Sequence, residues 1–255
     1  MQEQAILITG AGSGIGRGLA ELAAANGWHV IVTDLDRHAV DKTAQAIVAE
    51  GGRAEAFELD VTSSDSIRRV MEALGGRRVD VLINNAGVQY VAKLEDFPAD
   101  QWDLLVRVML NGACMMTRAV LPGMKHHGFG RIVNIGSIHS VVASPFKSAY
   151  VSAKHGLLGF SKVVALETAQ TDITINTICP SYVRTPLVDK QIANQAKEHG
   201  ISEDEVIREI MLKPMPKGVF VSIAELYGIV AFLVSDVARN ITGQAIMVDG
   251  GWTIQ

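Results

Sequence analysis

The stretch TGAGSGIG, residues Thr9–Gly16, joins a short apolar run, Ala5–Thr9, to a segment of helical periodicity, Gly14–Asn26. Glycines let the backbone turn sharply and approach a ligand closely, and the first amides of the helix then face that ligand. A glycine-rich turn between a strand and a helix is typical of a pyrophosphate-binding loop. It predicts that the chain opens with the first unit of a parallel α/β domain.

Outward from this turn, short β-branched runs alternate with longer amphipathic segments. The connections are too short for anything but crossovers, so the strands must be parallel, with helices on both faces. The sequence predicts an α/β fold: one doubly wound, Rossmann-like domain over residues 1–255, with about seven strands. The predicted strands are Ala5–Thr9, Trp28–Asp34, Arg53–Asp60, Asp80–Asn84, Gly130–Gly136, Ile173–Cys179 and Gln244–Val248. The predicted helices are Gly14–Asn26, Ala39–Glu50, Ser64–Leu74, Ala99–Lys125 (one or two helices), Ser148–Gln170 and Ile223–Ser235.

One segment, residues 187–221, interrupts this alternation. It carries two helical patterns, and Ser202 and Glu205 have the spacing of a capping box. An insertion at the carboxyl edge of a sheet predicts a mobile helical lid over the substrate. The alternative is a surface excursion without a role.

Composition narrows the function classes. The chain has 255 residues, 48% of them hydrophobic, and a net charge of −4, which argues against disorder and against binding nucleic acid. Two cysteines, Cys114 and Cys179, cannot build a disulfide framework or a four-thiolate zinc site, and the histidines show no convincing ligand spacing. The sequence has no uninterrupted apolar run near the roughly 20 residues of a membrane span, and no signal-peptide pattern. We therefore expect a cytoplasmic protein with no resident metal and no membrane or nucleic-acid partner.

Acidic residues follow the next two predicted strands. Asp34 ends the second strand, where a carboxylate can accept hydrogen bonds from a ribose diol and would repel a 2′-phosphate. This position favours NAD over NADP, and the alternative is that Asp34 merely caps the following helix. Asp60 and Val61 close the third strand, where they could meet the adenine.

Three side chains predict a catalytic site at the carboxyl edge of the sheet. Tyr150 and Lys154 are four residues apart on a predicted helix, so they share one face. Ser137 follows the fifth strand, and the stretch NNAG, Asn84–Gly87, follows the fourth. Ligands bind at this edge in open parallel sheets.

Hydride transfer at a carbinol carbon requires a proton to leave or reach the oxygen. For tyrosine to move it near neutral pH, its pKa must fall from about 10 by roughly 3 units, which is about 4 kcal/mol. One ammonium about 4 Å away supplies about 4 kcal/mol at an effective dielectric near 20. We therefore expect Lys154 to lower the pKa of Tyr150, while Ser137 holds the substrate oxygen by a hydrogen bond.

These motifs, in this order, resemble the short-chain dehydrogenase/reductase family over essentially the whole chain. The resemblance implies a homotetramer, an NAD cofactor, and a fourth catalytic residue, Asn111; the alternative for Asn111 is a mid-helix amide bonded to a carbonyl. The sequence departs from the family pattern after the sixth strand, where Pro180-Ser181 stands in place of Pro-Gly. The implied cofactor-binding residues are Gly10, Ser13, Gly14, Ile15, Gly16, Asp34, Asp60, Val61, Asn85, Ala86, Gly87, Tyr150, Lys154, Pro180, Val183 and Thr185.

A closer resemblance is to the branch of this family that oxidises 3-hydroxybutyrate. It rests on Gln89, on GSIH at Gly136–His139, on KSAY at Lys147–Tyr150 and on the segment Thr185–Ile192. It implies the reversible oxidation of (R)-3-hydroxybutyrate to acetoacetate, with the substrate bound by Gln89, Ser137, His139, Lys147, Tyr150 and Gln191.

A small anionic substrate agrees with these side chains, because a buried carboxylate needs a cation and several donors. Taken singly, each of the polar residues could equally be an ordinary surface residue. Tyr182 stands where the branch tends to have tryptophan, and Trp252 could wall the pocket or pack at a subunit interface. Two alternatives stay open: the same reaction on a 3-oxoacyl thioester, a sugar or a steroid alcohol, or a nucleotide-binding scaffold without turnover.

Overall fold

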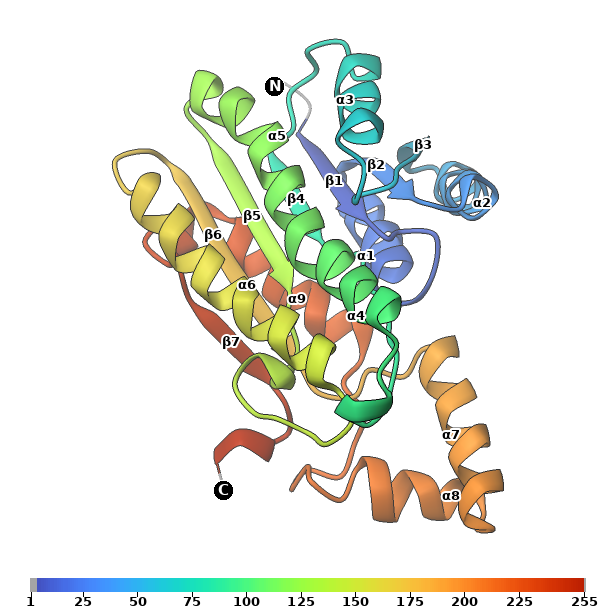
Figure 1. Cartoon of the computed structure of the whole chain (residues 1–255). Helices are drawn as coiled ribbons and strands as arrows, with labels where there is room; N and C mark the ends of the chain where they lie inside the picture. Colours follow the sequence, from blue (N-terminus) through green and yellow to red (C-terminus); the bar gives the residue numbers. More distant parts are fainter. Residues whose placement is uncertain (1–3, 255) are drawn as a thin grey trace.

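The computed structural model describes residues 4–254, which form a layered α/β fold around one twisted sheet (Figure 1). Across these residues the sheet has seven strands in the order β3-β2-β1-β4-β5-β6-β7, and every neighbouring pair is parallel. The order reverses between β1 and β4, which opens a crevice at their carboxyl ends. The predicted doubly wound, Rossmann-like fold is confirmed. The strands are β1 Ala5–Thr9, β2 His29–Asp34, β3 Arg53–Glu58, β4 Val81–Asn84, β5 Gly130–Ile135, β6 Ile173–Pro180 and β7 Ala245–Val248.

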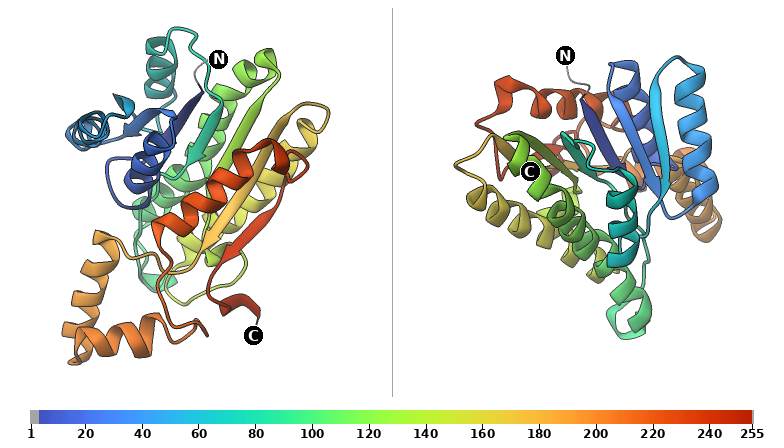
Figure 2. Two further views of the ribbon diagram at one scale, coloured as in Figure 1. Left: turned by 180° about the vertical axis from the view of Figure 1, so that it is seen from behind. Right: turned by 90° about the horizontal axis from the view of Figure 1, so that it is seen from above.

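Helices cover both faces of the sheet, as Figure 2 shows from behind and from above. α1, α2 and α9 pack on one face, and α3, α5 and α6 pack on the other. α7 and α8 stand apart from both layers, beyond the carboxyl edge of the strands (Figure 1). The helices are α1 Gly14–Ala25, α2 Arg37–Ala49, α3 Ser64–Ala73, α4 Ala99–Val106, α5 Gly112–His127, α6 Ser148–Glu167, α7 Pro186–His199, α8 Glu203–Glu205 and α9 Ile223–Val234.

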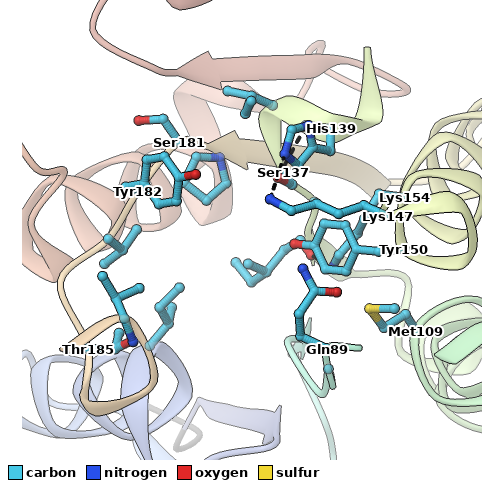
Figure 3. Close-up of a pocket in the computed structure, with 18 of the residues that line it drawn as sticks. Gln89, Met109, Ser137, His139, Lys147, Tyr150, Lys154, Ser181, Tyr182 and Thr185 are labelled. Carbon is cyan, nitrogen blue, oxygen red and sulfur yellow. Dashed lines mark hydrogen bonds between the residues drawn. The ribbon is translucent and has the colours of Figure 1, made fainter. Parts of the chain in front are cut away.

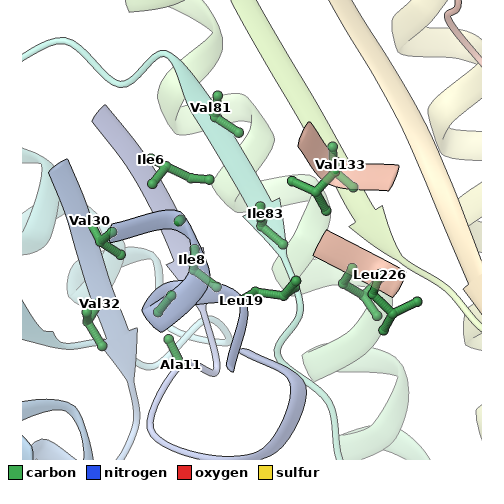
Figure 4. Close-up of a cluster of buried hydrophobic side chains, with 14 of the residues drawn as sticks. Ile6, Ile8, Ala11, Leu19, Val30, Val32, Val81, Ile83, Val133 and Leu226 are labelled. Atoms are coloured by element: carbon green, nitrogen blue, oxygen red, sulfur yellow. The ribbon is translucent and has the colours of Figure 1, made fainter. Parts of the chain in front are cut away.

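The two faces of each central strand bury different apolar layers. On β1, Ile6 and Ile8 face the layer of α1 and α9, whereas Ala5 and Leu7 face the layer of α3 and α5. Figure 4 shows the first of these layers, where Leu19 of α1 packs over the strands. Burial on both faces explains why these strands are continuous apolar runs rather than alternating ones.

The segment between β4 and β5 is helical from Ala99 to His127, with a π turn at Arg107–Asn111 between α4 and α5. Its length and its mean hydropathy of 1.4 would allow it to cross a membrane, although no uninterrupted apolar run of that length exists in the sequence. A core helix of a soluble protein meets the same criterion, and α5 here packs on β4 and β5. The expected absence of a membrane partner stays a prediction.

The inserted segment contains both predicted helical patterns. α7 is followed by a short helical stretch, α8, and a π turn at Val206–Met211. Ser202 and Glu205 form the predicted capping box, in which the Glu205 amide donates to Ser202 Oγ at 3.2 Å and the Ser202 amide donates to Glu205 Oε2 at 2.9 Å. Whether this segment moves as a lid stays a prediction.

The first turn requires glycine for two reasons, a positive φ angle and a lack of space for a side chain. Gly10 and Gly14 have φ angles of +65° and +55°, a region that favours glycine. Gly16 is required because a Cβ there would lie 2.3 Å from the Gly10 carbonyl oxygen and 2.4 Å from Asn85 Nδ2. The turn therefore closes against the end of β4, and a side chain would force the two apart.

We expect Gly16→Ala to lower the free energy of unfolding by more than about 2 kcal/mol, because backbone must move to admit the methyl group. Gly123→Ala is the matched control, since a Cβ at this exposed position of α5 would meet nothing within 4 Å. It should leave stability unchanged or raise it by up to about 1 kcal/mol. Urea denaturation followed by circular dichroism measures both, and equal effects would contradict this account of the turn.

Candidate active site

A cavity of about 230 Å³ lies at the carboxyl edge of the sheet (Figure 3). Its walls come from the loop after β4, the end of β5, the first turns of α6, the end of β6, the start of α7 and the C-terminal turn. Side chains far apart in sequence meet there because parallel strands deliver their carboxyl ends to one edge. The cavity contains all six predicted substrate-binding residues: Gln89, Ser137, His139, Lys147, Tyr150 and Gln191.

The hydroxyl groups of Ser137 and Tyr150 face each other in this cavity. Ser137 lies two residues after the end of β5 and caps a short turn, Ile138–Ser140, where its Oγ accepts from the His139 amide at 3.2 Å. Tyr150 lies in the first turn of α6 and is hydrogen-bonded to Ser137. The turn and the helix therefore hold two hydroxyls where one substrate oxygen could contact both.

Lys154 lies one helical turn after Tyr150 and is only 5% exposed. Its Nζ donates to the Ile135 carbonyl oxygen at 2.6 Å and lies 5.7 Å from the centroid of the Tyr150 ring. Burial lowers the pKa of Lys154 to about 8, because the ammonium loses hydration. The side chain still carries a positive charge at neutral pH.

We expected a lowered pKa for Tyr150, but in this structure its pKa is raised. Burial is the main cause, and the nearby Cys179 and Tyr182 act in the same direction, while the hydrogen bond from Ser137 opposes them. The sequence argument counted the Coulomb attraction of the ammonium and left out the desolvation of the phenolate.

Lys147 and His139 lie side by side in the cavity. Lys147 Nζ and Ser144 Oγ each lie 3.4 Å from His139 Nε2. Burial, with the charge of Lys147 as a second cause, lowers the pKa of His139 to about 4. The imidazole is therefore neutral near pH 7 and can accept from the ammonium, which leaves Lys147 as the cation of this part of the cavity.

The loop that carries Gln89 is tied to the start of α6. The Ala92 amide donates to the Phe146 carbonyl oxygen at 3.0 Å. Phe146 has a φ of +68°, which is unusual for a residue with a Cβ and costs about 1 kcal/mol or more. This strained residue directly precedes Lys147, whose ammonium lies beside His139, whereas the amide of Gln89 points towards Tyr150 (Figure 3).

Aromatic rings close the cavity on the side opposite the loop of Gln89. Trp252 lies edge-on to His139, with ring centroids 6.1 Å apart, and its centroid is 5.9 Å from that of Tyr182. The C-terminal turn is held by Asp249, which accepts from the Thr253 amide at 2.8 Å. Trp252 is thus a wall of the cavity, and its packing at a subunit interface stays an open alternative.

The catalytic role predicted for Asn111 stays a prediction, because its side chain is not among those that the cavity brings together. Asn111 ends the π turn with an exposed side chain, and it does not line the cavity. Met109 lines it instead and is 2% exposed. The buried stripe of this helix runs through Leu105, Met109 and Ala113 at intervals of four residues, so a side chain two positions after Met109 faces away.

The predicted cofactor residues divide into two groups. Tyr150, Lys154 and six others line the cavity itself: Ile15, Asn85, Gly87, Pro180, Val183 and Thr185. The rest lie in the glycine turn (Gly10, Ser13, Gly14 and Gly16) and at or just after the ends of β2, β3 and β4 (Asp34, Asp60, Val61 and Ala86). A site that runs from the end of β2 to the cavity has the extended form that a dinucleotide needs.

The two acidic residues at the strand ends are placed differently. Asp34 Oδ2 accepts from the Gly12 amide at 3.0 Å, whereas the cap of α2 is Asp36, which accepts from the Ala39 amide. The alternative that Asp34 merely caps α2 is therefore excluded. Asp60 accepts from the amide and hydroxyl of Thr62, at 2.8 and 2.7 Å, so it shapes its own turn.

The residues present fit a dinucleotide. The Ser13 side chain makes no capping bond to α1, and Gly10 and Gly14 bring backbone rather than side chain to the crevice. Asp34 retains acceptor positions, since a carboxylate has about four and this one receives the amides of Gly12 and Asp36. Within residues 4–254, no group of three or more His, Cys, Asp or Glu side chains could hold a metal ion.

Several lining residues were not predicted from the sequence, among them Met109, Val88, Ser181 and Val188. The apolar residues at intervals of four, Leu105, Met109 and Ala113, are a pattern in the sequence that would have predicted a buried Met109. Ser181 was noted only as a departure from the family pattern. Val88 and Val188 carry no chemical signal, because apolar side chains on loops and helix starts look alike whether or not they meet a cavity.

Comparisons with known proteins agree with this geometry. Residues 10–253 match a family model described as enoyl-(acyl carrier protein) reductase. D-beta-hydroxybutyrate dehydrogenases from Rhizobium meliloti (strain 1021) and Cupriavidus necator are each 44% identical over 253 residues, covering 98% of this chain and 98% and 97% of theirs. The structure of an actinorhodin polyketide ketoreductase with NADPH superposes with a TM-score of 0.92 at 32% identity, covering 98% of this chain and 97% of that one.

The fold and the site define a nicotinamide-dependent oxidoreductase. The chain belongs to the short-chain dehydrogenase/reductase family, as the resemblance of its motifs predicted.

The low pKa of His139 predicts how stability depends on pH. A base whose pKa is about 4 when folded and about 6.5 when unfolded is protonated first in the unfolded chain, so stability falls as pH drops from about 6.5 towards 4. His139→Gln should remove this contribution, so that the free energy of unfolding of the variant falls less steeply with decreasing pH than that of the wild type. Urea denaturation at several pH values between 7 and 4.5 measures it, and parallel declines for the two proteins would contradict a neutral buried His139.

Proposed function

We propose that this protein catalyses the reversible, NAD-dependent oxidation of (R)-3-hydroxybutyrate to acetoacetate. The observation that carries the proposal is that a cation, Lys147, shares one small cavity with the hydroxyls of Ser137 and Tyr150. A short hydroxy acid has the matching groups, a carboxylate at one end and a carbinol two carbons away. Two relatives at 44% identity carry the name of this activity, which supports the choice of substrate.

In this proposal the hydroxyls of Ser137 and Tyr150 bind the substrate oxygen. Tyr150 takes the carbinol proton during oxidation and returns it during reduction, and the ammonium of Lys154 favours the phenolate. A bound NAD would accept or supply the hydride. Because the pKa of Tyr150 is raised, the phenol is protonated at neutral pH, which suits reduction, and oxidation is expected to accelerate as pH rises.

The carboxylate would lie at the other end of the cavity. Lys147 supplies the charge, and two amides supply donors, that of Gln89 from the loop after β4 and that of Gln191 from α7. Gln191 lies on α7, so a mobile lid would complete the site only when closed. The aromatic wall of Tyr182 and Trp252 limits the length of substrate that fits, which disfavours long acyl thioesters and steroids.

The direct test is a steady-state assay with NAD and (R)-3-hydroxybutyrate, with Tyr150→Phe as the diagnostic variant. We expect turnover by the wild type and a loss of about 10²- to 10⁴-fold in kcat for the variant, since the proton transfer is lost. NAD binding, followed by fluorescence, should survive the substitution. Turnover of sugars or 3-oxoacyl thioesters alone would show another substrate, and no turnover of any alcohol would favour a nucleotide-binding scaffold.

A substitution of Lys147 distinguishes the proposal of an anionic substrate from that of a neutral one. Lys147→Ala should raise KM for 3-hydroxybutyrate at least about 10-fold while changing kcat less, because a buried carboxylate would lose its cation. Lys42→Ala, on the exposed face of α2, is the matched control and should leave KM unchanged. If both variants keep the wild-type KM, Lys147 does not bind the substrate.

Asp34 is the basis for proposing NAD rather than NADP. Asp34→Asn keeps an acceptor for the Gly12 amide but removes the charge that would repel a 2′-phosphate. We expect the ratio of kcat/KM with NADP to that with NAD to rise at least about 10-fold, because like-charge repulsion is relieved. An unchanged ratio would mean that Asp34 does not face the ribose.

We also propose a homotetramer in the cytoplasm, as the sequence analysis expected. Exposed apolar side chains on α6 and near the end of α9, namely Val163, Leu166, Phe232 and Val237, support burial against further copies of the chain. Light scattering after size-exclusion chromatography tests the assembly, and a monomer at micromolar concentration would exclude it.

A further inference from the structure

The short turn after β5 is closed by two hydrogen bonds between the same two serines. The Ser137 amide donates to Ser140 Oγ at 3.2 Å, and the Ser140 amide donates to the Ser137 carbonyl oxygen at 2.8 Å. Ser140 is only 1% exposed, so the proton of its hydroxyl must also find an acceptor inside the protein. That acceptor fixes how the turn is held.

The acceptor is the thiol of Cys179 on β6, which is fully buried. Its sulfur accepts from the Ser140 hydroxyl and from the Ser137 amide. Gly136 permits this close approach, because a Cβ there would lie 2.9 Å from Ser140 Oγ and 3.0 Å from Cys179 Sγ. The turn after β5 is therefore tied to the neighbouring strand.

The turn also decides where the proton of the Ser137 hydroxyl points. Ser137 Oγ accepts from the His139 amide at 3.2 Å, and it donates to the Tyr150 hydroxyl, since this bond acts to lower the pKa of Tyr150. A serine hydroxyl has a single proton. Because the amide of the turn occupies an acceptor position of Ser137 Oγ, the proton is left to face the cavity.

We propose that Ser140 and Cys179 are positioning residues for Ser137. Ser140 closes the turn, the Cys179 sulfur accepts the Ser140 hydroxyl, and together they keep the Ser137 hydroxyl aimed at the substrate oxygen. Neither Ser140 nor Cys179 lines the cavity, so both act through Ser137. The effect on turnover rests on the proposed function of Ser137, whereas the arrangement of the turn does not depend on the substrate.

A double-mutant cycle separates positioning from a purely structural role. With whichever alcohol the wild type oxidises, Ser140→Ala should lower kcat about 10-fold and change KM less, because a misaimed donor weakens transition-state binding most. In a Ser137→Ala background the same substitution should change kcat less than about 2-fold, because the hydroxyl that it positions is gone. Equal losses in the two backgrounds would overturn the positioning role.

Substitutions of Cys179 test the support of the turn by β6. Cys179→Ala should lower kcat at least about 3-fold, because the Ser140 hydroxyl loses its acceptor. Cys179→Ser should recover most of that loss, since its oxygen can accept the same bond. Cys114→Ala is the matched control, at a half-buried cysteine of α5 that does not line the cavity, and should leave kcat unchanged. A wild-type kcat in Cys179→Ala would overturn the role of the thiol.

Crystal structures of the wild type and of Ser140→Ala decide the arrangement without any substrate. We expect Ser137 Oγ to leave the His139 amide in the variant, while Tyr150 and Lys154 keep their wild-type positions. An unmoved Ser137 hydroxyl would overturn the proposal. If the wild type oxidises no alcohol, the proposed function fails, and this comparison still decides whether Ser140 positions Ser137.

Discussion

The active site depends on one buried charge, the ammonium of Lys154 at the carboxyl edge of the sheet. Its hydrogen bond to the Ile135 carbonyl oxygen joins α6 to the end of β5, two residues before Ser137. The same bond places Tyr150, one turn earlier on α6, beside Ser137. Because a buried ammonium must be compensated, the strand end, the helix and the polar groups around Lys154 are constrained to one arrangement.

The second cation, Lys147, has a different proposed role from that of Lys154. It stands beside His139, whose imidazole is neutral because it is buried and next to a positive charge. One lysine therefore lies on the helix that carries Tyr150, and the other lies at the part of the cavity that we propose for the carboxylate. An aromatic wall bounds the cavity, with Trp252 held in place by the turn that Asp249 stabilises.

Most of the fold and the centre of the site could be predicted from sequence, because both follow from local rules. The apolar run Ala5–Thr9 is β1 with the predicted bounds, and four-residue spacing put Tyr150 and Lys154 on one face. Two features needed the structure. The motif points to Asn111, whereas only the packing of its helix shows that Met109 is the residue that lines the cavity. The pKa of Tyr150 was judged from one charge, whereas desolvation depends on all the atoms packed around the phenol.

The central claim is that one cavity holds a carboxylate at Lys147 and a carbinol oxygen at Ser137 and Tyr150. A crystal structure of the protein with NAD and acetoacetate tests it most directly. The account predicts the carboxylate within hydrogen-bond distance of Lys147 Nζ and the ketone oxygen within reach of both hydroxyls. A carboxylate bound elsewhere, or a ketone oxygen turned away from Tyr150, would contradict it.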